Sequence, residues 1–382
     1  MMHEIESIGA RGEGVAAKGD VVVYTAESCR AEHDHATCMA IARTLAAIKD
    51  YTFAGEYDVD GHYAKPLYFV PTDTLVGVGH ACALGIAGEH DLFGGVVPHP
   101  FVGTKCISHP LVDDRARVPD GWSEAFARRV RCAVLEGFAA FSTDDAFRAG
   151  LRLFAHGPVR VKRALGIGGY GQTVVTGHEA LERALADADT AEVARYGIAL
   201  EQDLADVITH SVGQVRLGAL LATYCGTQRL TPNNHGHPVY GGSDLLVARG
   251  GFDELLALQP APSARRAVEQ ARVYDDAAFA CFDGLFASRR NYDIAEGNDA
   301  AGEHRCGVLE QSWRIGGASG AEVAALSAFR ADPSLAVVRA SSVEVYGADA
   351  SPPRDATVYF HGVDAHAGPL TKYFVLSRHV HD

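Results

Sequence analysis

Short apolar runs and one stretch of helical periodicity open the chain. Residues 20–25 form a β-branched run typical of a buried strand, and residues 33–49 carry apolar side chains at helical spacing. Residues 66–71 are a second strand-like apolar run. This alternation predicts a small α/β domain with a parallel sheet, which we assign to residues 1–103.

The middle of the chain, residues 104–200, also alternates between the two periodicities and is expected to form a second unit. Strands are predicted at residues 133–138, 158–162, 173–176 and 198–202. Helices are predicted at residues 122–131, 144–154 and 178–187.

The last part, residues 201–382, is predicted to be rich in strands. Strand-like residues run from 212 to 225, and residues 264–286 predict a long helix. Two strands at residues 291–297 and 307–317, with Asn, Asp and Gly between them, predict a hairpin, and a helix follows at residues 320–330. The complete pattern predicts an α/β (α+β) protein of several packed units.

Composition narrows the function classes. With 382 residues the chain exceeds one ordinary domain, and its net charge of −14 argues against nucleic acid or an anionic membrane as the main partner. We find no signal peptide and no apolar run long enough to cross a bilayer. The eight cysteines form no CxxC pair, which favours free thiols in a reducing cytoplasm.

The predicted hairpin carries the strongest candidate chemistry. Because strand side chains repeat every two residues, Glu310, Ser312 and Arg314 share one face, as do Asn291 and Asp293 on the first strand. If the two faces coincide, carboxylate and hydroxyl oxygens suited to Mg²⁺ lie beside a guanidinium suited to phosphate or carboxylate. The alternative is a solvated hairpin with a cross-strand ion pair.

A glycine-rich segment forms the second candidate. Residues 166–171 fit the letters of G-x-G-x-x-G, but residues 172–175 favour a strand where a dinucleotide fingerprint requires a helix. A glycine-rich loop between two strands is instead a flap whose backbone N–H groups can cover phosphates, and Lys162 lies just before it. An ordinary hairpin with a surface lysine is the alternative.

The order of these features resembles the ATP-grasp superfamily. Lys162 precedes the glycine loop, Glu201 ends a later strand, and Asp293 and Glu310 lie on the hairpin. The resemblance covers about residues 104–330. Within the superfamily, the chain is similar to an uncharacterised bacterial, biotin-carboxylase-like branch. It implies an ATP-grasp fold with a pre-ATP-grasp domain (1–103), a lid subdomain (104–200) and a large subdomain (201–382).

The resemblance also implies a nucleotide site for ATP. Lys105 and Lys162 would reach the phosphates, Glu201 would lie at the hinge beside the adenine, and Leu204 would offer a backbone contact. The lid residues would be Gly168, Gly169, Tyr170 and Gly171.

The same resemblance makes Asp293 and Glu310 the carboxylates that bridge Mg²⁺, with Mn²⁺ as an alternative, and Arg314 the arginine of the E-x-N-x-R signature. The family usually has asparagine where this chain has Ser312, so either Ser312 binds through water or Asn291 supplies the amide. Arg289, just before the metal strand, is a candidate for holding the substrate carboxylate or for a surface role.

These parts imply an ADP-forming ligase that joins a small-molecule carboxylate to an amine or thiol through an acyl phosphate. Kinase-like phosphoryl transfer is one alternative, and a non-catalytic nucleotide-binding protein, suggested only by Ser312, is another. No nucleic-acid or membrane partner is expected, and a homodimer is left open.

Overall fold

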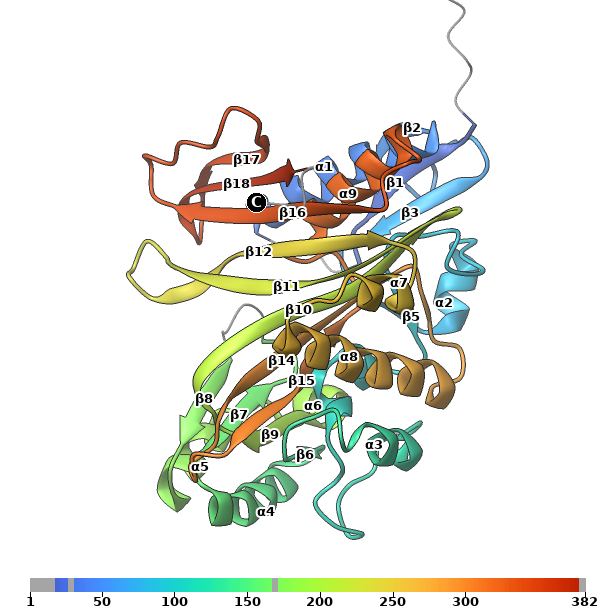
Figure 1. Cartoon of the computed structure of the whole chain (residues 1–382). Coiled ribbons are helices and arrows are strands. Elements are labelled where there is room, and N and C mark those ends of the chain that lie inside the picture. The colour runs from blue at the N-terminus through green and yellow to red at the C-terminus, as the bar shows by residue number, and fades with distance from the viewer. Residues whose placement is uncertain (1–17, 27–30, 167–170, 378–382) are drawn as a thin grey trace, which may run out of the picture.

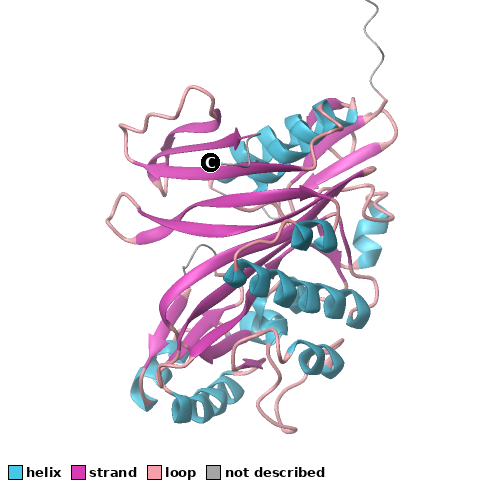
Figure 2. Ribbon diagram, in the orientation of Figure 1, coloured by secondary structure: helices cyan, strands magenta, loops and turns pink. Residues whose placement is uncertain are grey.

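The computed structural model describes residues 18–26, 31–166 and 171–377. It is a mixed α/β structure built around a large twisted sheet, with a small parallel sheet at one end and a small antiparallel sheet at the other (Figures 1 and 2). This architecture confirms the predicted fold class.

The N-terminal sheet has three parallel strands in the order β2-β1-β3. They are β1 (Asp20–Tyr24), β2 (Thr52–Glu56) and β3 (Leu67–Pro71). The helix α1 (Glu32–Lys49) packs its apolar stripe on this sheet, as its periodicity predicts. The predicted α/β opening is therefore confirmed.

The second sheet is antiparallel and has the strand order β6-β9-β7-β8. Its strands are β6 (Gly137–Ala140), β7 (Val159–Arg163), β8 (Gln172–Val175) and β9 (Ile198–Gln202). The glycine-rich segment joins β7 to β8, and Lys162 lies opposite Gln172. A strand rather than a helix therefore follows the glycines, which excludes the dinucleotide fingerprint.

Helices cover one face of this second sheet. They are α4 (Thr143–Leu153), α5 (His178–Ala186) and α6 (Thr190–Tyr196). Their apolar side chains pack against Val159, Val161, Ile198 and Leu200. Since strand side chains alternate between faces, Lys162 and Glu201 project from the face opposite these helices.

The large sheet has eight antiparallel strands in the order β15-β14-β10-β11-β12-β16-β18-β17. Its strands are β10 (Ala205–Leu217), β11 (Leu220–Pro232), β12 (Pro238–Arg249), β14 (Arg289–Asn298), β15 (His304–Ser312), β16 (Val337–Tyr346), β17 (Thr357–Asp364) and β18 (Gly368–Ser377). The strand-like residues predicted from 212 to 225 do lie in strands, but in two of them, because Gly218 adopts a φ of +60° and the chain reverses between β10 and β11.

The remaining elements connect the sheets. They are β4 (Leu75–Val76), α2 (Val78–Ala83), β5 (Gly95–Val97), α3 (Glu124–Val130), α7 (Phe252–Ala257), α8 (Pro262–Cys281), β13 (Phe286–Ala287) and α9 (Ser319–Ala331), with 3-10 turns at Pro100–Gly103, Lys105–Ser108 and Phe154–His156. The helix predicted over residues 264–286 ends early, since β13 pairs with β5.

Two helical layers enclose the large sheet (Figure 2). Helices α1 and α9 pack on one face, and α3 and α8 pack on the other. In the described part of the chain, no helix has the length and apolarity needed to span a membrane. The seven cysteines within the described ranges are all free thiols.

A fully buried ion pair fixes α9 to the large sheet. Arg289 on β14 donates from Nε and Nη2 to the two carboxylate oxygens of Glu322 on α9, at 3.0 and 2.8 Å. The Tyr224 hydroxyl donates to the same carboxylate from β11. These groups satisfy one another in the core, so the position of α9 depends on all three.

Glu322→Ala should lower the free energy of unfolding by about 3–5 kcal/mol, because it leaves the Arg289 charge buried without its partner. Urea unfolding measures the change. Glu124→Ala is the matched control: Glu124 also lies in the first turn of a helix, but it and its partner Arg128 are 80% and 72% exposed. That change should cost less than about 1 kcal/mol. Equal losses in the two variants would contradict the role given to the buried pair.

Candidate functional site

The register of the β14–β15 hairpin brings the predicted metal ligands together. Asp293 lies directly opposite Glu310, and Asn291 lies opposite Ser312. Asp293 accepts a hydrogen bond from Gln228 Nε2 on β11 at 2.8 Å. Two carboxylates thus face each other on an antiparallel pair, an arrangement that is unfavourable without a nearby cation.

Lys105 supplies a cation from outside the large sheet. Its Nζ lies 2.7 Å from Glu310 Oε2 and donates to the Gly166 carbonyl at 2.9 Å. Gly166 belongs to the connection after β7, so one ammonium group joins the carboxylate hairpin to the start of the glycine-rich segment. The predicted phosphate-binding lysine and a predicted metal ligand are therefore in direct contact.

Gln311 holds the segment that carries Lys105. Its Nε2 donates to the carbonyls of Val102 and Thr104 at 2.9 and 2.8 Å. Its Oε1 accepts from the buried Tyr274 hydroxyl at 3.1 Å. Because side chains alternate along β15, Gln311 anchors this segment from the face opposite Glu310.

A second buried cluster contains Lys162, Glu201 and His109. Lys162 forms an ion pair with Glu201, and His109 Nε2 lies 3.2 Å from the same carboxylate. Burial acts to raise the pKa of Glu201, but the charges of Lys162 and His109 outweigh it and lower the pKa to about 2. Glu201 is thus a buried anion with the Lys162 ammonium on one side and the His109 imidazole on another.

The surroundings shift the pKa values of the two hairpin carboxylates in opposite directions. Burial, and then the charge of Glu310, raise the pKa of Asp293 to about 7. Burial opposes ionisation of Glu310 as well, but Lys105 and then Lys162 lower its pKa below the ordinary value. Since the Lys162 charge also lowers the pKa of Glu310, Lys162 and the hairpin carboxylates belong to one electrostatic environment.

The neighbouring polar residues are engaged by protein groups. Ser312 Oγ accepts from Arg289 Nη1 at 3.2 Å, and the Asn291 amide nitrogen donates to the Ser211 hydroxyl at 2.9 Å. Arg314 lies just past the end of β15, with its Nε 3.5 Å from a carboxylate oxygen of Asp73. That Ser312, through water, or Asn291 completes a metal site stays a prediction.

The structure corrects the expectation that Arg289 holds a substrate carboxylate. Its guanidinium is completely buried, and besides Glu322 it donates from Nη1 to the backbone carbonyls of Ser312 and Arg314. The physical reason is that the side chain faces α9, where Glu322 satisfies its charge. Arg289 therefore braces the end of β15 from within the core.

The remaining predicted nucleotide residues are only partly described. Leu204 is buried just after β9 and packs with Leu135 and Ala295. Gly171 has a φ of +72°, which a glycine adopts without strain. Gly168, Gly169 and Tyr170 lie outside the described residues, and their roles stay predictions.

The donor set fits Mg²⁺ bound together with phosphate. Within the described ranges, no group of three or more His, Cys, Asp and Glu side chains could hold a metal by itself. Mg²⁺ typically takes one or two carboxylates and fills its other positions with water and phosphate oxygens. The Asp293–Glu310 pair provides those carboxylates, and a cation beside them would relieve the burial and the Glu310 charge that together raise the pKa of Asp293.

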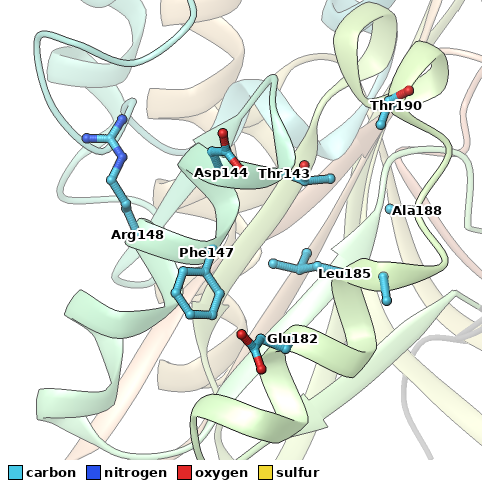
Figure 3. Close-up of a pocket in the computed structure, with 9 residues that line it drawn as sticks. Thr143, Asp144, Phe147, Arg148, Glu182, Leu185, Ala188 and Thr190 are labelled. Carbon is cyan, nitrogen blue, oxygen red and sulfur yellow. The ribbon is translucent and has the colours of Figure 1, made fainter.

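A surface depression lies elsewhere, among α4, α5 and the residues just before α6 (Figure 3). Phe147 and Leu185 line it together with the charged residues Arg148 and Glu182. It belongs to the helix-covered side of the four-stranded sheet, whereas Lys162 and Glu201 project from the other face. The depression is thus separate from the candidate site.

Sequence reasoning missed three residues of the site. Gln311 and Gln228 anchor Lys105 and Asp293, and His109 contacts Glu201. Gln311 carried a usable signal, because a polar residue between Glu310 and Ser312 on a strand must face the opposite, interior side. Gln228 and His109 lie far along the chain from their partners and carried no local signal.

Asp293→Asn should change how stability depends on pH. Because the pKa of Asp293 is raised in the folded state, its protonation favours folding. This contribution to the free energy of unfolding is fully present below the ordinary pKa of 3.8 and is lost as the pH rises through about 7. The variant lacks this loss. With EDTA present, it should exceed the wild type by about 1–2 kcal/mol near pH 8 and by less near pH 5.

Urea unfolding at both pH values measures this difference, and Asp349→Asn on an exposed loop controls for the loss of one negative charge. A gain from Asp293→Asn that is the same at both pH values would contradict the assigned interaction between the two carboxylates.

Comparison with solved structures identifies the fold. N5-carboxyaminoimidazole synthetase from Staphylococcus aureus, complexed with ADP, is similar over 95% of this chain and 94% of its own, with a TM-score of 0.54 and 10% identity. Carboxyaminoimidazole ribonucleotide synthase from Aspergillus clavatus, complexed with ATP, covers the same shares with a TM-score of 0.52 and 12% identity. The chain thus has the ATP-grasp fold.

Among curated proteins, no sequence matches this chain. The sequence does match one family, described as "Protein of unknown function (DUF3182)", over residues 21–374. With nearly its whole length covered by that match, and with the fold described above, the chain belongs to the DUF3182 family and has the ATP-grasp architecture.

Proposed function

We propose that this protein is an ATP-dependent carboxylate ligase that works through an acyl phosphate and releases ADP and phosphate. The observation that carries the proposal is the 2.7 Å contact between Lys105 and Glu310, beside Asp293. It joins a cation suited to phosphate with a carboxylate suited to Mg²⁺, and two structures of similar fold are complexed with ADP and with ATP.

In the first step, a substrate carboxylate oxygen attacks the γ-phosphorus of ATP, the bond to the bridging oxygen breaks, and ADP leaves. Lys105 and Lys162 stabilise the negative charge on the phosphates as fixed positive groups. Mg²⁺, or Mn²⁺ in its place, held by Asp293 and Glu310 would neutralise phosphate charge. The residues of the protein thus contribute to catalysis by positioning the reactants and by stabilising negative charge.

In the second step, an amine or thiol attacks the acyl carbon, phosphate departs, and the nucleophile's proton passes to solvent. Arg314 follows directly after the hairpin and offers a guanidinium near Glu310, whose pKa it helps to lower. Arg289 contacts the Ser312 and Arg314 carbonyls and so acts as a positioning residue. We place the reaction in the cytoplasm, in keeping with the free thiols.

Glu310→Gln and Lys162→Met should each lower ADP release by about 100-fold or more, because each removes a charge that stabilises the transferring phosphoryl group. Methionine replaces Lys162 since that side chain is buried and its volume must be kept. The assay supplies ATP, MgCl₂ and a panel of small carboxylates, with hydroxylamine to trap an acyl phosphate as a hydroxamate.

Glu303→Gln at the exposed tip of the same hairpin and Lys18→Ala are the matched controls and should retain full activity. Circular dichroism checks that each variant folds. Undiminished turnover in both site variants would remove the catalytic assignment. ADP release without free phosphate or hydroxamate would favour a kinase, and ATP binding without any turnover would favour a non-catalytic nucleotide-binding protein.

A further inference from the structure

Both lysines predicted to bind phosphate already have carboxylate partners. Lys105 contacts Glu310 at 2.7 Å, and Lys162 is paired with Glu201. The two partners differ in their proposed roles, because Glu310 is a predicted metal ligand and Glu201 is not. Metal binding would therefore affect the partner of Lys105 directly.

The two pairs also differ in how accessible they are. The Lys162 and Glu201 side chains are 3% and 2% exposed, and His109 closes the carboxylate from a further side. In the other pair Lys105 is 4% exposed, but Glu310 is 34% exposed. A cation from solvent can thus reach Glu310, while the Glu201 pair is enclosed by protein.

We infer that Glu310 is an exchangeable counter-ion for Lys105: a divalent cation takes over Glu310 and thereby frees the Lys105 ammonium for a nucleotide phosphate. The inference rests on the proposed function and adds a regulatory property to the same site. Metal and nucleotide then bind with positive coupling that passes through a residue of the protein, in addition to any direct contact between them.

The physical basis is competition for one carboxylate. Without metal, a nucleotide phosphate must draw Lys105 away from Glu310 and then lie beside two carboxylates, Glu310 and Asp293. With metal at the pair, the charge that holds Lys105 is already compensated. Lys105 keeps its hydrogen bond to the Gly166 carbonyl, which fixes the ammonium close to the site.

A double-mutant cycle tests this exchange. Isothermal titration calorimetry measures ADP binding in excess EDTA for the wild type, Glu310→Gln, Lys105→Met and the double variant. Glu310→Gln should tighten metal-free ADP binding by about tenfold, because Lys105 no longer has a charged partner. In the Lys105→Met background the same change should tighten binding by less than about twofold.

The test compares how much Glu310→Gln tightens ADP binding when Lys105 is present and when it is replaced. Equal tightening in both backgrounds would mean simple relief of charge repulsion, and it would overturn the exchange. Asp293→Asn is the matched control, since it removes a carboxylate from the same pair while leaving the Lys105–Glu310 contact in place. Any tightening that Asp293→Asn produces should depend on Lys105 less than the tightening that Glu310→Gln produces, because Asp293 is not the carboxylate in contact with Lys105.

The reciprocal measurement needs no nucleotide and no change at Glu310. If Lys105 competes with metal, Lys105→Met should bind Mn²⁺ alone about fivefold more tightly than the wild type, measured by electron paramagnetic resonance. Unchanged or weaker Mn²⁺ binding by this folded variant would overturn the exchange.

The same titrations separate the two proposals. A wild type that binds no ADP even with excess MgCl₂ would end the proposed function and the exchange with it. If the wild type binds ADP with MgCl₂, but Glu310→Gln tightens metal-free ADP binding equally with and without Lys105, only the exchange is overturned.

Discussion

The candidate site depends on the register of one hairpin. By pairing Asp293 with Glu310, β14 and β15 place two negative charges directly across from each other. Such a pair destabilises a sheet unless a cation compensates it. A shift of one residue in either strand would turn that strand's carboxylate to the other face, so the whole arrangement requires this register.

The compensation comes from a segment outside the sheet, and β15 itself holds that segment. Glu310 contacts the Lys105 ammonium, while the next residue, Gln311, binds the carbonyls on either side of Gly103. Since β15 is an edge strand, the segment can lie along it and present Lys105 to the other face. One strand therefore both carries the carboxylate and positions its counter-ion.

The end of β15 is fixed from the core by Arg289 and Glu322. Isolated charges are costly to bury, so this pair is retained only with its full set of hydrogen bonds, including the Tyr224 hydroxyl. The pair links α9 on one layer to the strand that precedes Arg314. The geometry of the hairpin thus depends on helix packing as well as on strand pairing.

The sequence by itself determined the elements whose signal is local. The apolar runs predicted the parallel opening sheet, and the strand after the glycines excluded a dinucleotide fingerprint. The Asn/Asp/Gly turn predicted the hairpin, and the period of two assigned Asp293 and Glu310 each to a face of its own strand; the register in the structure then showed that the two faces coincide. Turns such as the one at Gly218 were missed, because a strand-like pattern continues through them.

Only the tertiary structure decided which charge meets which. Lys105 could not be paired with Glu310, nor Lys162 with Glu201, from their positions in the chain. Arg289 looked like a substrate ligand in the sequence, but it lies in the core with Glu322. The reason is physical: periodicity assigns a side chain to a face of its own strand, whereas its partner is set by how distant elements pack.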